Sequence, residues 1–177
     1  MHNARNYPDV RSELFFDPTG PHGVAHSKRV MILAETLAAI HGCTKREIVA
    51  LRKASAYHDI GRVDNSADTK HGFASAQKVI YRGLLSNSSV DQDVISLIEQ
   101  HCLADSRKDH ILIRIFKDAD ALDRVRFGNQ DCGLDVWYLR TGHAKQLVGF
   151  AHMLLRQIPE VPREIPKCSL DLNLNDG

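Results

Sequence analysis

Apolar residues recur along this sequence at helical spacing, in one segment after another. The first such stripe runs from Val30 to Ala38, and the last, which is the most clearly amphipathic, runs from Ala144 to Ile158. Alternation of apolar and polar residues over the length of a useful strand is absent. The pattern therefore predicts an all-α protein, a single-domain helical bundle of about six main helices.

Polar residues mark where several of these helices begin. Thr44 with Glu47 three residues later is typical of a capping box, and Ser89 with Gln92 forms a second such pair. Asp109 is expected to cap the fifth helix.

The sequence divides into three parts by composition. Residues 1–21 are polar and rich in turn-forming residues, so we expect an extended N-terminal lead-in. Residues 22–158 carry the helical pattern, and residues 159–177 form a polar, proline-rich C-terminal tail. A chain of 177 residues is long enough to bury a core as one domain.

The charge balance excludes several kinds of partner. Lys and Arg number 23 against 22 Asp and Glu, a net charge of +1, which provides no field for long nucleic acid or an anionic membrane. No apolar stretch approaches a bilayer span, and the first residues lack the apolar core of a signal peptide. The four cysteines show no CxxC spacing and are expected to be reduced. We expect a cytoplasmic protein.

Histidine is unusually frequent, with ten residues. A lone buried histidine is more often a core residue whose ring nitrogens are satisfied by hydrogen bonds. Six metal-ligating side chains, however, fall on or beside the apolar stripes of successive helices: His26, His58, Asp59, His71, His101 and Asp120. A shared metal site would satisfy all six, because imidazole and carboxylate together suit first-row divalent ions.

The adjacent pair His58 and Asp59 is the sharpest of these features. Neighbours on a helix project about 100° apart, so both reach one ion only at a helix end or a bend. Gly61 supplies such an end two residues later.

Three segments of the sequence carry short motifs: residues 22–30 (HGVAHSKRV), residues 57–62 (YHDIGR) with the His-Asp pair, and residues 117–123 (KDADALD). They resemble the HxxRV helix, the His-Asp pair and the ADxLD segment of the HD-domain superfamily of metal-dependent phosphohydrolases. The resemblance covers roughly residues 22–158 and implies a helical fold of the HD type.

The resemblance also implies a set of metal ligands. The core site would consist of four residues, His26, His58, Asp59 and Asp120, and members with two metals carry further ligands where His71 and His101 stand. From the residues alone, His71 could equally be a surface histidine in a polar loop, and His101 a helix-terminal histidine near the C-terminal dipole. Periodicity does not choose between Asp118 and Asp120, which flank the stripe of their helix on opposite sides; the resemblance favours Asp120.

The implied cofactor is a divalent metal ion, one or two per chain, which could be Mn, Fe, Mg, Co, Ni or Zn. Such a site activates water at neutral pH, and no Ser, Cys or Thr stands in a recognisable nucleophile motif. Asp59 is expected to be catalytic as a bridging carboxylate. His22 is expected either to donate a proton to the leaving oxygen or to cap a helix.

Four cationic residues near these motifs are candidates for binding a substrate phosphate: Lys28, Arg29, Arg62 and Arg124. For Arg29, a structural pairing with a carboxylate is the alternative.

The function implied by the resemblance is a phosphohydrolase, either a phosphomonoesterase or a phosphodiesterase, with a small phosphorylated metabolite or nucleotide as substrate. One alternative is a di-iron oxygenase on the same scaffold. Another is a non-catalytic regulatory module that binds a metal or a nucleotide. The sequence leaves open the physiological metal, the substrate and whether the chain forms a homodimer.

Overall fold

The computed structural model describes residues 8–86, 88–128 and 133–160. Within these ranges the regular elements are seven α-helices and three short 3-10 helices, with no strand. The all-α prediction is therefore confirmed. No described helix is both long and apolar enough to cross a membrane.

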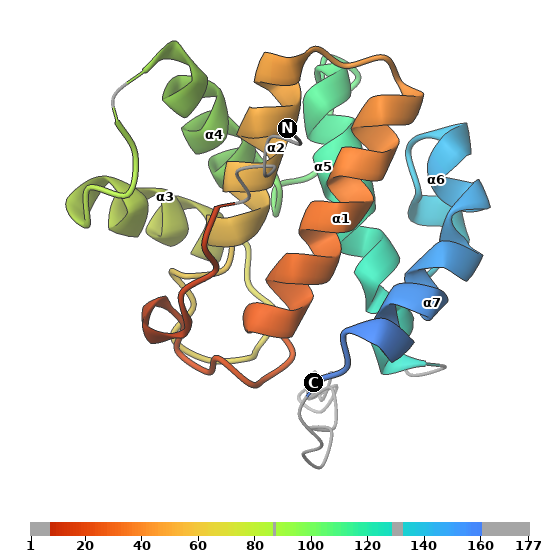
Figure 1. Cartoon of the computed structure of the whole chain (residues 1–177), viewed down its shortest axis with the longest axis horizontal. Helices are drawn as coiled ribbons and strands as arrows, with labels where there is room; N and C mark the ends of the chain where they lie inside the picture. The colour runs from red at the N-terminus through yellow and green to blue at the C-terminus, as the bar shows by residue number, and fades with distance from the viewer. Residues whose placement is uncertain (1–7, 87, 129–132, 161–177) are drawn as a thin grey trace, which may run out of the picture.

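The helices follow one another with short connections. The α-helices are α1 (Val24–Ile40), α2 (Lys45–Tyr57), α3 (His71–Tyr81), α4 (Ser89–Gln100), α5 (Ile111–Leu122), α6 (Gly142–Gln146) and α7 (Val148–Gln157). The 3-10 helices are η1 (Ser12–Leu14), η2 (Asp123–Phe127) and η3 (Val136–Tyr138). Figure 1 shows α3 and α4 on one side of α1, and α6 and α7 on the other.

The core lies where α1, α2 and α5 meet. Helix α1 packs against both α2 and α5, and α2 packs against α4. Leu33 and Leu37 of α1, Leu51 of α2, and Ile115 and Phe116 of α5 are fully buried there. Burial of these side chains supplies the main driving force for the fold, and it holds the N-terminal part of α1 beside α5.

The first predicted capping box is confirmed, and the second was placed one residue too late. Thr44 caps α2 and exchanges hydrogen bonds with Glu47. For α4, the cap is Ser88 and its partner is Asp91, because the aspartate three residues on accepts the hydrogen bond from the cap backbone.

The predicted cap of α5 was also wrong. The N-cap is His110, whose Nδ1 accepts a hydrogen bond from the backbone N–H of Leu112 at 3.3 Å. The carboxylate of Asp109 instead accepts from Lys117 Nζ at 3.2 Å.

The last apolar stripe belongs to two helices, α6 and α7, rather than one. The described residues therefore contain seven α-helices, where the sequence predicted about six. Leu147 leaves helical geometry with φ −90° and ψ 3°, and separates α6 from α7. Ala144, Ala151 and Leu154 are nevertheless all buried. A break that preserves the period of the apolar face is invisible in the sequence pattern.

The described part of the segment before α1, residues 8–23, is not wholly extended. It contains η1, and Leu14 and Phe15 are buried against the core. At the other end, residues 161–177 lie outside the described residues. Cys43 and Cys102 are free thiols, and Cys132 and Cys168 also lie outside the described residues.

Candidate metal centre

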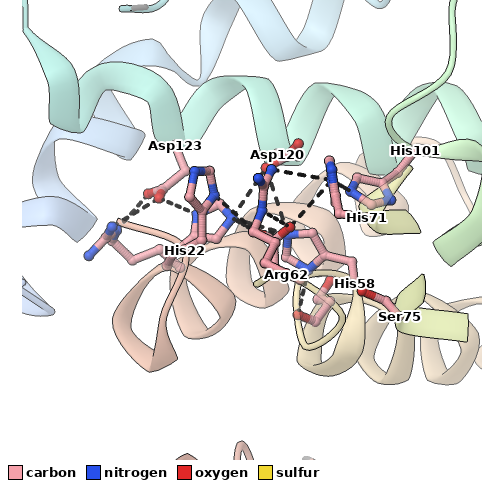
Figure 2. Close-up of polar contacts among 12 residues, drawn as sticks. His22, His58, Arg62, His71, Ser75, His101, Asp120 and Asp123 are labelled. Atoms are coloured by element: carbon pink, nitrogen blue, oxygen red, sulfur yellow. Dashed lines mark hydrogen bonds and ion pairs between the residues drawn. The ribbon is translucent and has the colours of Figure 1, made fainter. Parts of the chain in front are cut away.

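The six predicted ligand residues lie together in one cluster, although they come from five helices and a turn. His26 is in α1, His58 ends α2, Asp59 follows it, His71 begins α3, His101 ends α4 and Asp120 is in α5. All are buried except Asp120, whose side chain is 34% exposed. Figure 2 shows Asp120 projecting from α5 toward the histidines, with His71 and His101 side by side.

Four of these residues form a first group around His26. Its Nε2 atom lies 3.0 Å from Nε2 of His58, 3.3 Å from Oδ2 of Asp59 and 3.3 Å from Oδ1 of Asp120. The ligand atoms of His26, His58 and Asp120 lie within 4.8 Å of one another and could share one metal ion, and Asp59 belongs to overlapping groups of the same kind with His26 and with His58.

A second group lies on the other side of Asp59. Nε2 of His71 is 3.4 Å from Oδ1 of Asp59 and 2.9 Å from Nε2 of His101. The two carboxylate oxygens of Asp59 therefore face different groups, and Asp59 lies between two clusters that could each hold a cation.

Three of the imidazoles are anchored in the same way. In each, the Nδ1 atom hydrogen-bonds to the backbone carbonyl three residues earlier: His58 to Ser55 at 3.0 Å, His71 to Asp68 at 2.9 Å and His101 to Ile98 at 2.6 Å. Carbonyls in the last turn of a helix lack intrahelical partners, so the ends of α2 and α4 provide two of these acceptors, and Asp68 in the segment before α3 provides the third. With Nδ1 donating, Nε2 carries the lone pair that a metal ligand needs.

The protonation of these rings suits a cation. Burial lowers the pKa of His58 and His71, and it lowers the pKa of His101 to about 4, so all three are neutral at pH 7. The lone pairs of His71 and His101 then face each other at 2.9 Å, an arrangement that a cation between them would stabilise. The donor set of the cluster therefore fits a divalent metal.

The carboxylates around His26 also favour a cation in the cluster. Burial and Arg126 act to lower the pKa of His26, but hydrogen bonds to Asp120, Asp123 and Asp59 outweigh them and raise the pKa to about 10. The carboxylates around this imidazole thus favour positive charge at its position, which a divalent ion would also supply.

Asp123 is a site residue that the sequence interpretation missed. Its Oδ2 atom lies 2.8 Å from Nδ1 of His26, and its two oxygens also accept hydrogen bonds from Arg29. Asp123 is 1% exposed. Its position near the centre of the apolar stripe was the signal that could have found it, because a carboxylate there must have buried partners.

Arg29 does not fit the expected role of a phosphate clamp. Its side chain is fully buried, and besides Asp123 it donates to the carbonyl of Ile158 at 2.7 Å and to Glu160 at 3.0 Å. The alternative, a structural pairing with a carboxylate, describes what the structure shows.

Asp118 lies away from the cluster. It is fully buried and accepts hydrogen bonds from the backbone N–H groups of Arg140 and Thr141, at 2.7 and 2.8 Å. Its carboxylate holds the segment before α6 against α5, and the structure brings Asp120 to the cluster instead.

His22 lies in the cluster. Its Nδ1 is 3.0 Å from Oδ2 of Asp59, and burial lowers its pKa to about 4. The N-cap of α1 is Gly23, so His22 is not the cap. The contact it makes is with the Asp59 carboxylate.

The other cationic candidates lie in different surroundings. Arg62 donates from Nε to Oδ1 of Asp59 at 2.7 Å and therefore belongs to the cluster. Arg124 is exposed in η2, directly after α5. Lys28 is exposed and lines a cavity of about 550 Å³ together with Met31 and Ile158, to which none of the six cluster residues contributes.

Two glycines allow the helices to approach closely enough to form the cluster. A Cβ atom on Gly61 would collide with the backbone of Ser75 in α3, whose hydroxyl accepts a hydrogen bond from the Gly61 N–H at 2.9 Å. A Cβ atom on Gly72 would lie 2.6 Å from the carbonyl oxygen of Ile98 in α4. These contacts bring His71 close to both the His-Asp turn and the end of α4.

Comparison with known protein families agrees with this geometry. A family model of the HD domain matches residues 23–125, more than half of the chain. The chain therefore belongs to the HD-domain superfamily of metal-dependent phosphohydrolases. HD domains typically bind divalent metals, and the described His and Asp clusters could hold one. Searches of curated proteins and of solved structures each gave no match.

Proposed function

We propose that this protein is a metal-dependent phosphohydrolase that acts on a small phosphorylated metabolite or nucleotide. The observation that carries the proposal is the convergence of the buried imidazole Nε2 atoms and two carboxylates on one cluster. The proposed ligands of the principal ion are His26, His58, Asp59 and Asp120, with His71 and His101 beside them.

A divalent ion, when bound, acts as a Lewis acid toward a phosphoryl oxygen and lowers the pKa of a water bound to it to about 7 in favourable sites. The protein's own residues set the geometry. Asp123 and the helix-end carbonyls orient the imidazoles, and the hydrogen bond from His22 holds the carboxylate of Asp59. Fixed ligands of this kind avoid reorganisation when substrate arrives.

The exposure of Asp120 supports an approach of the substrate to the cluster beside this residue. This carboxylate is the most exposed of the proposed ligands. Arg124 is exposed in η2, the 3-10 helix that follows α5. It remains the candidate phosphate contact among the cationic residues proposed from the sequence. The net charge of +1 supports a small substrate over a long nucleic acid.

Elemental analysis of the purified protein, paired with a phosphatase screen, tests the proposal. The metal-free protein would be reloaded separately with Mn²⁺, Fe²⁺, Co²⁺, Ni²⁺, Mg²⁺ and Zn²⁺, and assayed against nucleotides and an arylphosphate. We expect bound metal and metal-dependent phosphate release, both abolished in Asp59→Ala.

Other outcomes of the screen would contradict the proposal in distinct ways. Bound metal without turnover of any phosphoester would favour a regulatory module. Iron with a visible absorption band and no phosphate release would favour a di-iron oxygenase. A chain that takes up no metal under any condition would remove the basis for both.

A further inference from the structure

The arginine that follows the His-Asp pair lies against the second group of the cluster. Arg62 donates from Nε to Oδ1 of Asp59 at 2.7 Å, and its Nη2 atom lies 3.3 Å from Nε2 of His71. These are the two atoms through which Asp59 and His71 would bind a second cation. Figure 2 shows Arg62 beneath Asp120 and next to His71.

In both contacts the guanidinium of Arg62 is the donor, and Asp59 and His71 are the acceptors. Because Nδ1 of His71 hydrogen-bonds to the carbonyl of Asp68, its Nε2 atom carries a lone pair that accepts from Arg62. The Nε and Nη2 groups of a guanidinium lie side by side, so one edge of Arg62 bridges the imidazole and the carboxylate.

Arg62 is also held from its other edge. Its Nη1 atom donates to the carbonyl of Ser66 at 3.0 Å and lies 3.8 Å from the carboxylate of Asp68. The side chain is 10% exposed. These acceptors lie in the segment between the His-Asp turn and α3, so the local chain fixes the guanidinium in this position.

We propose that Arg62 competes with a second metal ion for Asp59 and His71, so that the two cation positions of the cluster are unequal. The inference rests on the proposed function, since it requires that the first group binds a metal. Among the described residues, no arginine contacts the atoms that face one another in the first group, which include Oδ2 of Asp59. Arg62 instead contacts Oδ1 of Asp59 and Nε2 of His71, so an ion in the second group must displace it. A guanidinium keeps its charge at working pH, so deprotonation cannot remove the competitor.

Stepwise titration of the metal-free 177-residue chain with Mn²⁺ tests this proposal. Calorimetry gives the affinity of each ion, and electron paramagnetic resonance distinguishes an isolated Mn²⁺ from a coupled pair about 3.5–4 Å apart. For the wild-type chain we expect one ion to bind at least tenfold more tightly than any second. In Arg62→Gln, we expect the second ion to bind at least tenfold more tightly than in wild type, with the spectrum of a coupled pair.

Arg82→Gln is the matched control, because it removes an exposed arginine at the end of α3. We expect both affinities to stay as in wild type. An equal gain in this control would show that general charge, rather than competition at the site, sets the second affinity, and would overturn the proposal.

Two further results would overturn the proposal while leaving the proposed function intact. One is equal affinity for two ions in the wild-type chain, which needs no variant to be measured. The other is a folded Arg62→Gln variant whose second affinity is unchanged. A wild-type chain that binds no ion would instead contradict the proposed function itself, and this inference with it.

Discussion

Nδ1 of His26 lies 2.8 Å from Oδ2 of Asp123, across 97 residues of sequence. The other three histidines proposed as ligands, His58, His71 and His101, use a backbone carbonyl three residues earlier. The equivalent carbonyl of His26 belongs to Gly23 and already accepts from the N–H of Ser27. A histidine inside a helix needs its acceptor from elsewhere, and η2 supplies it.

We expect Asp123→Asn to weaken metal binding by about 10–100-fold, the usual effect of losing an outer partner of a ligating histidine. The variant should also lose about 3–5 kcal/mol of unfolding free energy, because buried Arg29 loses the buried carboxylate of Asp123 and keeps only that of the partly exposed Glu160. Calorimetric metal titration and thermal unfolding measure the two effects separately.

The matched control for this variant is Glu160→Gln. Glu160 also binds Arg29 but is partly exposed, and within the described residues its carboxylate makes no hydrogen bond or ion pair with His26. We expect metal affinity to change less than threefold in this control, a bound drawn from the modest effect of exposed charges. Wild-type affinity in Asp123→Asn would contradict the orienting role.

The two aspartates that flank the stripe of α5 should behave in opposite ways. Asp120→Asn removes a carboxylate from the first group and should reduce metal content and any phosphate release by tenfold or more. Asp118→Asn should lower stability, by about 1–3 kcal/mol, because the Arg140 and Thr141 N–H groups lose a charged acceptor. Elemental analysis should find unchanged metal content in Asp118→Asn. The reverse result would show that Asp118 is the ligand.

Gly72→Ala should disturb the second group of the cluster. The added methyl group would press on the carbonyl of Ile98 and on Cys102, and should cost about 1–3 kcal/mol of unfolding free energy. It should also weaken the binding of a cation beside His71. Gly149→Ala in α7 is the control, because nothing lies within 4 Å of its added methyl group and helix propensity favours alanine. Equal stability changes in the two variants would contradict the close-approach argument.

The pH dependence of stability should depend on Asp91. Burial alone would raise its pKa, but hydrogen bonds from Lys53 and Ser88 outweigh burial and lower the pKa below the ordinary value of 3.8. A lowered folded pKa stabilises the fold above the unfolded pKa, and this contribution is lost as the pH falls through the folded value. The stability difference between wild type and Asp91→Asn should therefore be constant above about pH 5 and shrink in more acidic solution.

Denaturant unfolding of both proteins between pH 2 and pH 7 measures that difference. Asp93→Asn serves as the control, because Asp93 and its partner Arg46 form an exposed pair. Its effect should stay below about 1 kcal/mol throughout this pH range. A difference for Asp91→Asn that grows on acidification would contradict the sign of the argument.

Local sequence patterns were sufficient to predict the helices of the core but not all of their ends. The capping box at Thr44 was predictable because both partners lie within four residues. The cap at Ser88 was misplaced by one residue, and the break at Leu147 was missed, because neither changes the apolar period.

By itself, the sequence determined the class of fold and the chemistry available to the site. Helical periodicity requires packed helices, and the HD-type motifs supply imidazoles and carboxylates whose burial together favours a metal. Tertiary packing decided which of these groups meet. Asp120 lies in the cluster, whereas Asp118 binds the backbone before α6. Arg29 is buried and pairs with Asp123. Arg62 contacts both Asp59 and His71. These choices depend on contacts between residues far apart in the chain, which local periodicity cannot encode.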